Sequence, residues 1–133
     1  IINKAIYNVD NMKIKFGKNI FLQNSKMNDS TSQIYSDETT SEQFYLVETI
    51  TLETIFKNFN INPFEISLIK VDIEGGEENI LDSLFYIHNN YNIPLYISFH
   101  YSWWINKDLE RFDFLSSDIK NKIISYPFIS ILF

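Results

Sequence analysis

Glycine is scarce and cysteine is absent, and each shortage excludes a class of site. Gly17, Gly75 and Gly76 are the only glycines in 133 residues, and they lack the spacing of a G-x-G-x-x-G turn or a Walker A loop. Without cysteine, no disulfide, thiolate metal site or cysteine nucleophile can form. We therefore predict no phosphate-cradling loop and no thiol chemistry.

Basic residues and long apolar runs are also in short supply. The chain has 11 Lys and Arg residues against 17 Asp and Glu residues, a net charge of −6, which argues against a nucleic-acid partner. No apolar run approaches the roughly 20 residues that a membrane helix needs, and no signal-peptide pattern is present. We expect a cytoplasmic protein with no membrane span and no nucleic-acid partner.

The length of the chain limits the number of domains. A chain of 133 residues can form one domain and is too short for two ordinary ones. It begins at Ile1, and residues 127–133 at its end are apolar and strand-like. We expect residues 1–133 to be a single incomplete domain in which the polar stretch 24–43 is an exposed loop.

Alternating apolar patterns predict the order of strands and helices. We predict strands over residues 1–7, 12–16, 45–50, 65–74, 95–100 and 128–132, and helical stretches over residues 52–59, 77–89 and 107–125. Strands that alternate with helices at this spacing indicate an α/β fold with a mainly parallel sheet. The first two strands, joined by a short turn, are typical of an antiparallel hairpin.

The predicted strand that ends near residue 74 carries charges among its apolar residues. Lys70, Asp72 and Glu74 alternate with apolar residues, so their side chains should share one face near the carboxyl end of the strand. Ligands bind at that end in open α/β sheets. Glu77 and Glu78 follow the glycine pair and fall in the first helical turn, where negative charge is favourable.

These carboxylates allow more than one kind of chemistry. Asp72 and Glu74 could bind Mg²⁺, or one of them could act as a general base with a positioning partner. A site that also includes Glu77 would suit a cation, a metal ion or a hydroxyl group. The alternative is a structural ion pair between Lys70 and one of the two carboxylates.

A second group of candidate residues follows the next predicted strand. His100 ends that strand, at the edge where the site should lie, and could accept a proton near neutral pH or simply be an ordinary polar residue. Tyr101, Trp103 and Trp104 come directly after it. They could stack on a flat acceptor or complete the core.

Four segments together resemble a known family. Residues 69–77 carry the pattern K-x-D-x-E-G-x-E, and residues 47–53 resemble a V-x-x-x-T-L-D segment with Glu53 in place of the aspartate. Residues 3–6 and 93–100 are similar to two further strands of that family. The chain thereby resembles the FkbM-type methyltransferases over most of its length, and residues 69–77 carry the specific motif.

This resemblance implies a fold, a reaction and a set of site residues. It implies a partial, Rossmann-like class I methyltransferase sheet that uses S-adenosylmethionine to methylate a hydroxyl oxygen of a small molecule, sugar, lipid or natural product. Asp72 and Glu74 would lie near the sulfonium and the acceptor oxygen, with His100 as a further catalytic residue. Asn3 and Ala5 would border the adenine.

The resemblance also implies which part of the domain is present. The family's acidic, glycine-rich cofactor loop would lie upstream, so the chain corresponds to the C-terminal half to two-thirds of the domain. Two other functions remain open on the sequence alone. One is a non-catalytic α/β module that binds carbohydrate or another protein, and the other is a metal-dependent enzyme that uses Asp72 and Glu74.

Overall fold

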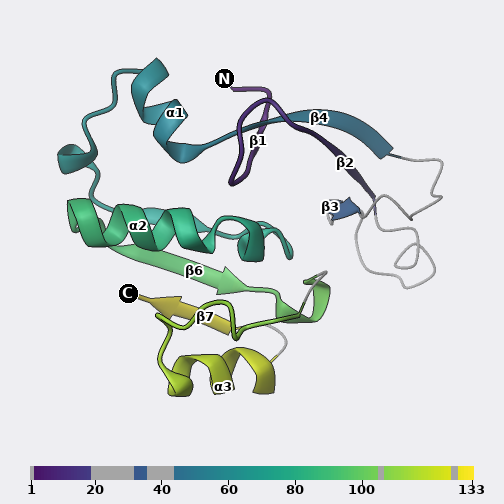
Figure 1. The fold of residues 1–133 in the computed structure, drawn as a ribbon, viewed down its shortest axis with the longest axis vertical. Coiled ribbons are helices and arrows are strands. Elements are labelled where there is room, and N and C mark those ends of the chain that lie inside the picture. The colour runs from purple at the N-terminus through teal and green to yellow at the C-terminus, as the bar shows by residue number, and fades with distance from the viewer. Residues whose placement is uncertain (1, 19–31, 36–43, 105–106, 127–128) are drawn as a thin grey trace.

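The part of the chain that the structure describes forms two separate sheets and three α-helices (Figure 1). The structure, a computed structural model, describes residues 2–18, 32–35, 44–104, 107–126 and 129–133. One sheet has the strand order β1-β4-β2-β3 and the other the order β5-β6-β7. The α/β prediction is confirmed, because strands and helices alternate from β4 to β7.

The first sheet is built from β1 (Ala5–Ile6), β2 (Lys13–Lys18), β3 (Ser32–Tyr35) and β4 (Phe44–Ile50). β1 runs parallel to β4, and β2 runs antiparallel to both β4 and β3.

The predicted hairpin between residues 1–7 and 12–16 is wrong, because β4 lies between these two segments. The end of β4 supplies the hydrogen bonds that a hairpin would have made. The Tyr7 backbone N–H donates to the Ile50 carbonyl, and the Asn11 N–H donates to the Thr49 carbonyl. The turn between β1 and β2 therefore wraps around the end of β4.

The predicted loop at residues 24–43 is wrong for residues 32–35, which form β3 against β2. Ile34 and Tyr35 give this short segment a β-branched residue and an aromatic one, which favour a strand. The rest of that stretch lies outside the described residues.

Helix α1 (Leu52–Asn58) follows β4 directly. Thr51 caps it, since its hydroxyl oxygen accepts the Thr54 backbone N–H at 3.2 Å. Leu52 is buried in the core, whereas Phe59, just after the helix, is more than half exposed.

The second sheet is built from β5 (Ile69–Val71), β6 (Leu95–Phe99) and β7 (Ile129–Leu132). β5 and β6 are parallel, but β6 and β7 are antiparallel. The expectation of a mainly parallel sheet is therefore wrong, since three of the five pairings between described strands are antiparallel. The chain leaves β6 at Phe99 and returns to the same end, where Ile129 pairs with Phe99.

The helices around this sheet are shorter than the periodicity predicts. A 3-10 turn (Glu77–Asn79) precedes α2 (Leu81–Tyr91), and α3 (Ser117–Ser125) covers only the end of the predicted stretch 107–125. Figure 1 shows α2 running along β6 and α3 on the side of β7. No helix among the described residues has both the length and the apolar character that a membrane crossing requires.

The main core lies between α2 and the buried face of β6. Leu81, Leu84 and Ile87 of α2 and Leu95, Ile97 and Phe99 of β6 are all fully buried in this cluster. Their alternation along β6 leaves Tyr96 and Ser98 on the more exposed face. The packed face holds the ends of β5 and β6 rigidly side by side, and this edge carries the predicted site.

Candidate active site

Asp72 and Glu74 lie just beyond the end of β5. The strand stops at Val71, so alternation along a strand does not bring the two carboxylates together. Glu74 and Gly75 instead have φ values of 54° and 95°, in the left-handed region. This turn folds Glu74 back toward the side on which Asp72 lies, and both side chains remain partly exposed.

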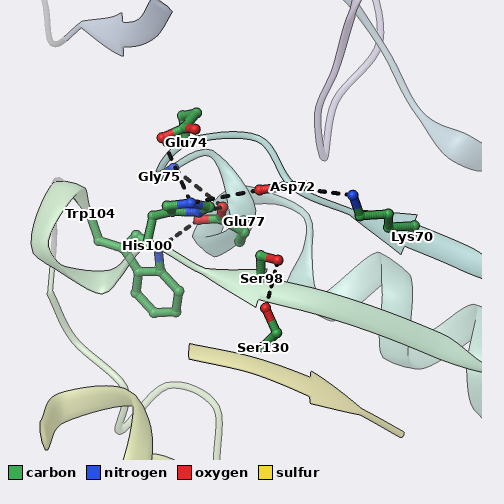
Figure 2. Close-up of polar contacts among 9 residues, drawn as sticks. All are labelled: Lys70, Asp72, Glu74, Gly75, Glu77, Ser98, His100, Trp104 and Ser130. Carbon is green, nitrogen blue, oxygen red and sulfur yellow. Dashed lines mark hydrogen bonds and ion pairs between the residues drawn. The ribbon is translucent and has the colours of Figure 1, made fainter. Parts of the chain in front are cut away.

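His100 meets these carboxylates from the neighbouring strand. It follows Phe99, the last residue of β6, and parallel neighbours end at the same edge of a sheet. Its Nε2 atom lies 3.7 Å from Asp72 Oδ1 and 3.7 Å from Glu74 Oε2. Figure 2 shows the imidazole at the centre of this group. The structure thus brings together the three residues predicted as catalytic.

Glu77 is the residue of this site whose role the sequence did not reveal. Its side chain is completely buried, and its Oε1 atom lies 2.7 Å from His100 Nδ1. Trp104 Nε1–H donates to Oε2 at 3.0 Å, and the Gly75 backbone N–H approaches Oε1 at 3.3 Å. The sequence held one signal for this role, since Glu77 is the last position of the K-x-D-x-E-G-x-E pattern. Its predicted place in a first helical turn, where negative charge is favourable, gave the residue another explanation.

The donors around Glu77 indicate which nitrogen of the His100 ring carries the proton. Trp104 Nε1–H and the Gly75 N–H can only donate, and each faces a different oxygen of Glu77. This arrangement fits an ionised carboxylate, which can only accept, and with an ionised Glu77 the 2.7 Å contact has His100 Nδ1 as its donor. A neutral ring with that bond carries its proton on Nδ1 and leaves Nε2 facing Asp72 and Glu74.

The predicted ion pair of Lys70 is also present. Its Nζ atom lies 3.3 Å from Asp72 Oδ2, and both side chains are well exposed. Such surface pairs contribute about 0–1 kcal/mol to stability. The pair uses one carboxylate oxygen and leaves Oδ1 on the side of His100, so it does not conflict with a functional site.

The aromatic residues after His100 serve mainly the core. Trp104 is buried, and the centroid of its ring lies 6.1 Å from that of Phe99 and 5.4 Å from that of Tyr101. Its indole N–H supports Glu77, which is a structural role rather than stacking on an acceptor. The side chain of Trp103 lies outside the described residues.

The two residues predicted near adenine lie on the other sheet. Ala5 belongs to β1, where it pairs with Thr49, and Asn3 precedes that strand. Asp72 and His100 instead follow β5 and β6 of the second sheet. This segment does contact the 3-10 turn that carries Glu77, because the Tyr7 hydroxyl donates to Asn79 at 3.0 Å.

The group formed by Asp72, Glu74 and His100 suits a positively charged ligand. One potential ligand atom from each residue lies within 4.8 Å of the other two. Oxygen and imidazole nitrogen donors of this kind bind divalent cations. The same carboxylates can attract a sulfonium, and His100 Nε2 can accept a proton from a hydroxyl group.

Comparison with known proteins identifies a family. The family model described as Methyltransferase FkbM domain matches residues 4–117, well over half of the chain. The matched span contains Asp72, Glu74, Glu77 and His100. No curated protein and no solved structure matches the chain.

Proposed function

We propose, from the premise that this chain belongs to the methyltransferase FkbM domain family, that it takes part in methyl transfer from S-adenosylmethionine to a hydroxyl oxygen. The acceptor would be a small molecule or a glycan. The observation that carries the proposal is the position of His100 Nε2, 3.7 Å from both Asp72 and Glu74. A proton acceptor and two carboxylates thus meet at the ligand-binding edge of a sheet.

The chain's own residues supply the proton transfer. A hydroxyl oxygen becomes a better nucleophile as it loses its proton, which His100 Nε2 would accept. The resulting imidazolium is stabilised by Glu77 at Nδ1, at 2.7 Å, and by the charges of Asp72 and Glu74. General-base catalysis of this kind contributes about 10²- to 10⁴-fold to a rate.

The same carboxylates fit the charge of the methyl donor. When bound, S-adenosylmethionine supplies an electrophilic methyl group on a positively charged sulfur. Asp72 is our candidate for the residue closest to that charge, because its side chain is 43% exposed and open to a ligand. Asn3 and Ala5 remain predicted neighbours of the adenine. A Rossmann-like arrangement of the complete sheet also remains a prediction.

A second candidate function depends on the same three residues. Their close donor atoms favour a divalent cation that would hold and polarise the acceptor hydroxyl. Methyl transfer measured before and after treatment with a strong chelator separates the two versions. The metal-assisted version predicts loss with the chelator and recovery with added Mg²⁺, whereas unchanged activity contradicts it.

Substitution of Asp72 tests the main proposal. We expect Asp72→Ala to lower the rate of methyl transfer by about 10²-fold or more, because it removes a charge from the reacting group. Transfer is measured with a radiolabelled methyl group and a panel of hydroxylated acceptors, and cofactor binding by calorimetry.

The matched control is Asp82→Ala, which removes an exposed carboxylate from α2 and should leave the rate unchanged. Unaltered transfer in Asp72→Ala would refute its assignment. Failure of the full-length wild-type protein to bind S-adenosylmethionine would refute the cofactor.

A further inference from the structure

We propose that Glu77 is a positioning residue, which fixes the tautomer and the orientation of His100 so that Nε2 faces the reacting hydroxyl. The part of this inference that concerns rate rests on the proposed function. The part that concerns the tautomer can be measured without turnover. The feature behind it is a completely buried carboxylate against one nitrogen of a ring whose other nitrogen faces the partly exposed carboxylates of Asp72 and Glu74 (Figure 2).

The first step of the argument is the asymmetry between the two ring nitrogens. His100 Nδ1 is 2.7 Å from Glu77 Oε1, a hydrogen-bond distance, whereas Nε2 is 3.7 Å from each of Asp72 and Glu74. A ring flipped about its Cβ–Cγ bond would bring a carbon atom against Glu77 and lose the short bond. The buried carboxylate therefore selects one orientation of the ring.

The second step is that Glu77 is held independently of His100. Trp104 donates to Oε2 at 3.0 Å, and Trp104 itself is buried among the core aromatics. Gly75 donates from the turn that also carries Glu74. The carboxylate thus links the rigid core to the turn and presents a fixed acceptor to the imidazole, as an outer carboxylate commonly does for a functional histidine.

The third step is a comparison with the adjacent carboxylate. Glu78 is almost as buried as Glu77, but its Oε2 atom lies 4.0 Å from Arg111 Nη2, and its carbonyl accepts a hydrogen bond from the same guanidinium. Two successive buried glutamates in one turn therefore serve different partners. Glu78 is thus a buried glutamate of the same turn whose ion pair is with Arg111, and it serves as the matched control for Glu77.

The substitution Glu77→Gln changes the hydrogen-bond pattern with almost no change in shape. An amide NH₂ must replace one of the two oxygens and would face either Trp104 Nε1–H or His100 Nδ1. The first arrangement opposes two donors across the 3.0 Å contact with Trp104. The second opposes the Gly75 N–H across a longer 3.3 Å contact and requires a lone pair on Nδ1, which moves the ring proton to Nε2. We expect Glu77→Gln to shift His100 toward the Nε2–H tautomer.

The experiment is long-range ¹H–¹⁵N NMR of the histidine rings, recorded at a pH where both are neutral. His88 serves as an internal reference, because its Nδ1 lies 2.9 Å from the Ile93 carbonyl and must therefore carry the proton. A His88→Gln variant assigns the two sets of signals. We expect the wild type and Glu78→Gln to show the Nδ1–H tautomer at His100, and Glu77→Gln to show Nε2–H while His88 is unchanged.

The rate of methyl transfer provides the second readout. We expect Glu77→Gln to reduce kcat by about 10- to 100-fold with little change in KM, and Glu77→Asp, which keeps the charge, to recover part of the loss. Circular dichroism checks that each variant is folded, and Glu77→Asp should retain the Nδ1–H tautomer. Glu78→Gln should keep the wild-type kcat.

The two proposals fail in different ways. An Nε2–H tautomer at His100 in the wild type, or an unchanged tautomer in Glu77→Gln, overturns the role of Glu77 even if methyl transfer is observed. A tautomer that responds as expected in a protein without methyl transfer supports the role of Glu77 and overturns the proposed reaction.

Discussion

Asp10 and Glu77 each show how one carboxylate can organise several donors. Asp10 accepts the Thr54 hydroxyl at 2.6 Å, the Thr51 backbone N–H at 2.7 Å and the Thr51 hydroxyl at 3.3 Å. The bond from the Thr54 side chain, followed by that from the Thr51 backbone, lowers the pKa of Asp10. Asp10 thereby ties the turn after β1 to the first turn of α1.

The lowered pKa of Asp10 predicts a pH dependence of stability. A group whose pKa is lower in the folded state stabilises the fold above its unfolded pKa of about 3.9, and this contribution disappears as the pH falls through the folded value. We expect Asp10→Asn to unfold more easily than the wild type at pH 6, and the difference to shrink below about pH 4. Urea denaturation across this pH range measures it. A difference that is constant with pH would contradict the account.

Sequence and structure agree unevenly on the residues of the site. The meeting of Asp72 and His100 was predictable, because residues at the ends of neighbouring parallel strands lie at one edge. Glu74 joins them through the left-handed turn and not through the strand alternation that the sequence suggested. The role of Glu77 was not, since a sequence gives the charge of a side chain and not the direction in which the fold buries it. The K-x-D-x-E-G-x-E pattern singles out Glu77, but only the three-dimensional turn shows its contact with His100.

At the scale of elements, the turn after β5 determines the shape of the site. β5 has three residues, and the chain then passes through two left-handed positions at Glu74 and Gly75. Glycine has no Cβ and adopts the φ value of 95° at Gly75 without steric conflict. The same turn brings the Gly75 N–H to Glu77.

Substitution of Gly75 tests this element. We expect Gly75→Ala to lower the free energy of unfolding by about 1–2 kcal/mol, because a Cβ atom disfavours the left-handed region. Chemical denaturation measures the change. The matched variant is Gly76→Ala, where φ is −78° and a Cβ would come 3.2 Å from the tip of the Ile73 side chain. Its effect should be smaller, and an equal or larger effect would contradict the argument.

The sequence predicted which elements exist better than how they pair. The apolar residues of α2 and β6 form the core, because the spacing of apolar residues along the sequence reports their burial directly. The pairing of β1 with β4 was missed, since it depends on long-range bonds such as the one from Tyr7 to Ile50. The direction of β7 was missed for a similar reason, because an intervening helix does not by itself require a parallel return.

At the scale of the whole molecule, the two sheets are connected close to the site. Tyr7 directly follows β1, and its hydroxyl donates a hydrogen bond to Asn79 in the 3-10 turn that also carries Glu77 and Glu78. Partial burial of this hydroxyl, followed by the charge of Glu78, raises the pKa of Tyr7, so the donor stays protonated at neutral pH. Helices α1 and α2 are also joined, since Ser83 donates to Glu53 at 3.0 Å.

The central claim is that a hydroxyl oxygen is methylated where His100 faces Asp72 and Glu74. The most direct test is transfer of a ¹³C-labelled methyl group from S-adenosylmethionine to a hydroxylated acceptor, compared between the wild type and His100→Gln. We predict an O-methyl signal in the wild-type product and a loss of about 10²-fold or more in the rate for His100→Gln. An undiminished rate in His100→Gln, or a label on nitrogen or carbon instead of oxygen, would contradict the account.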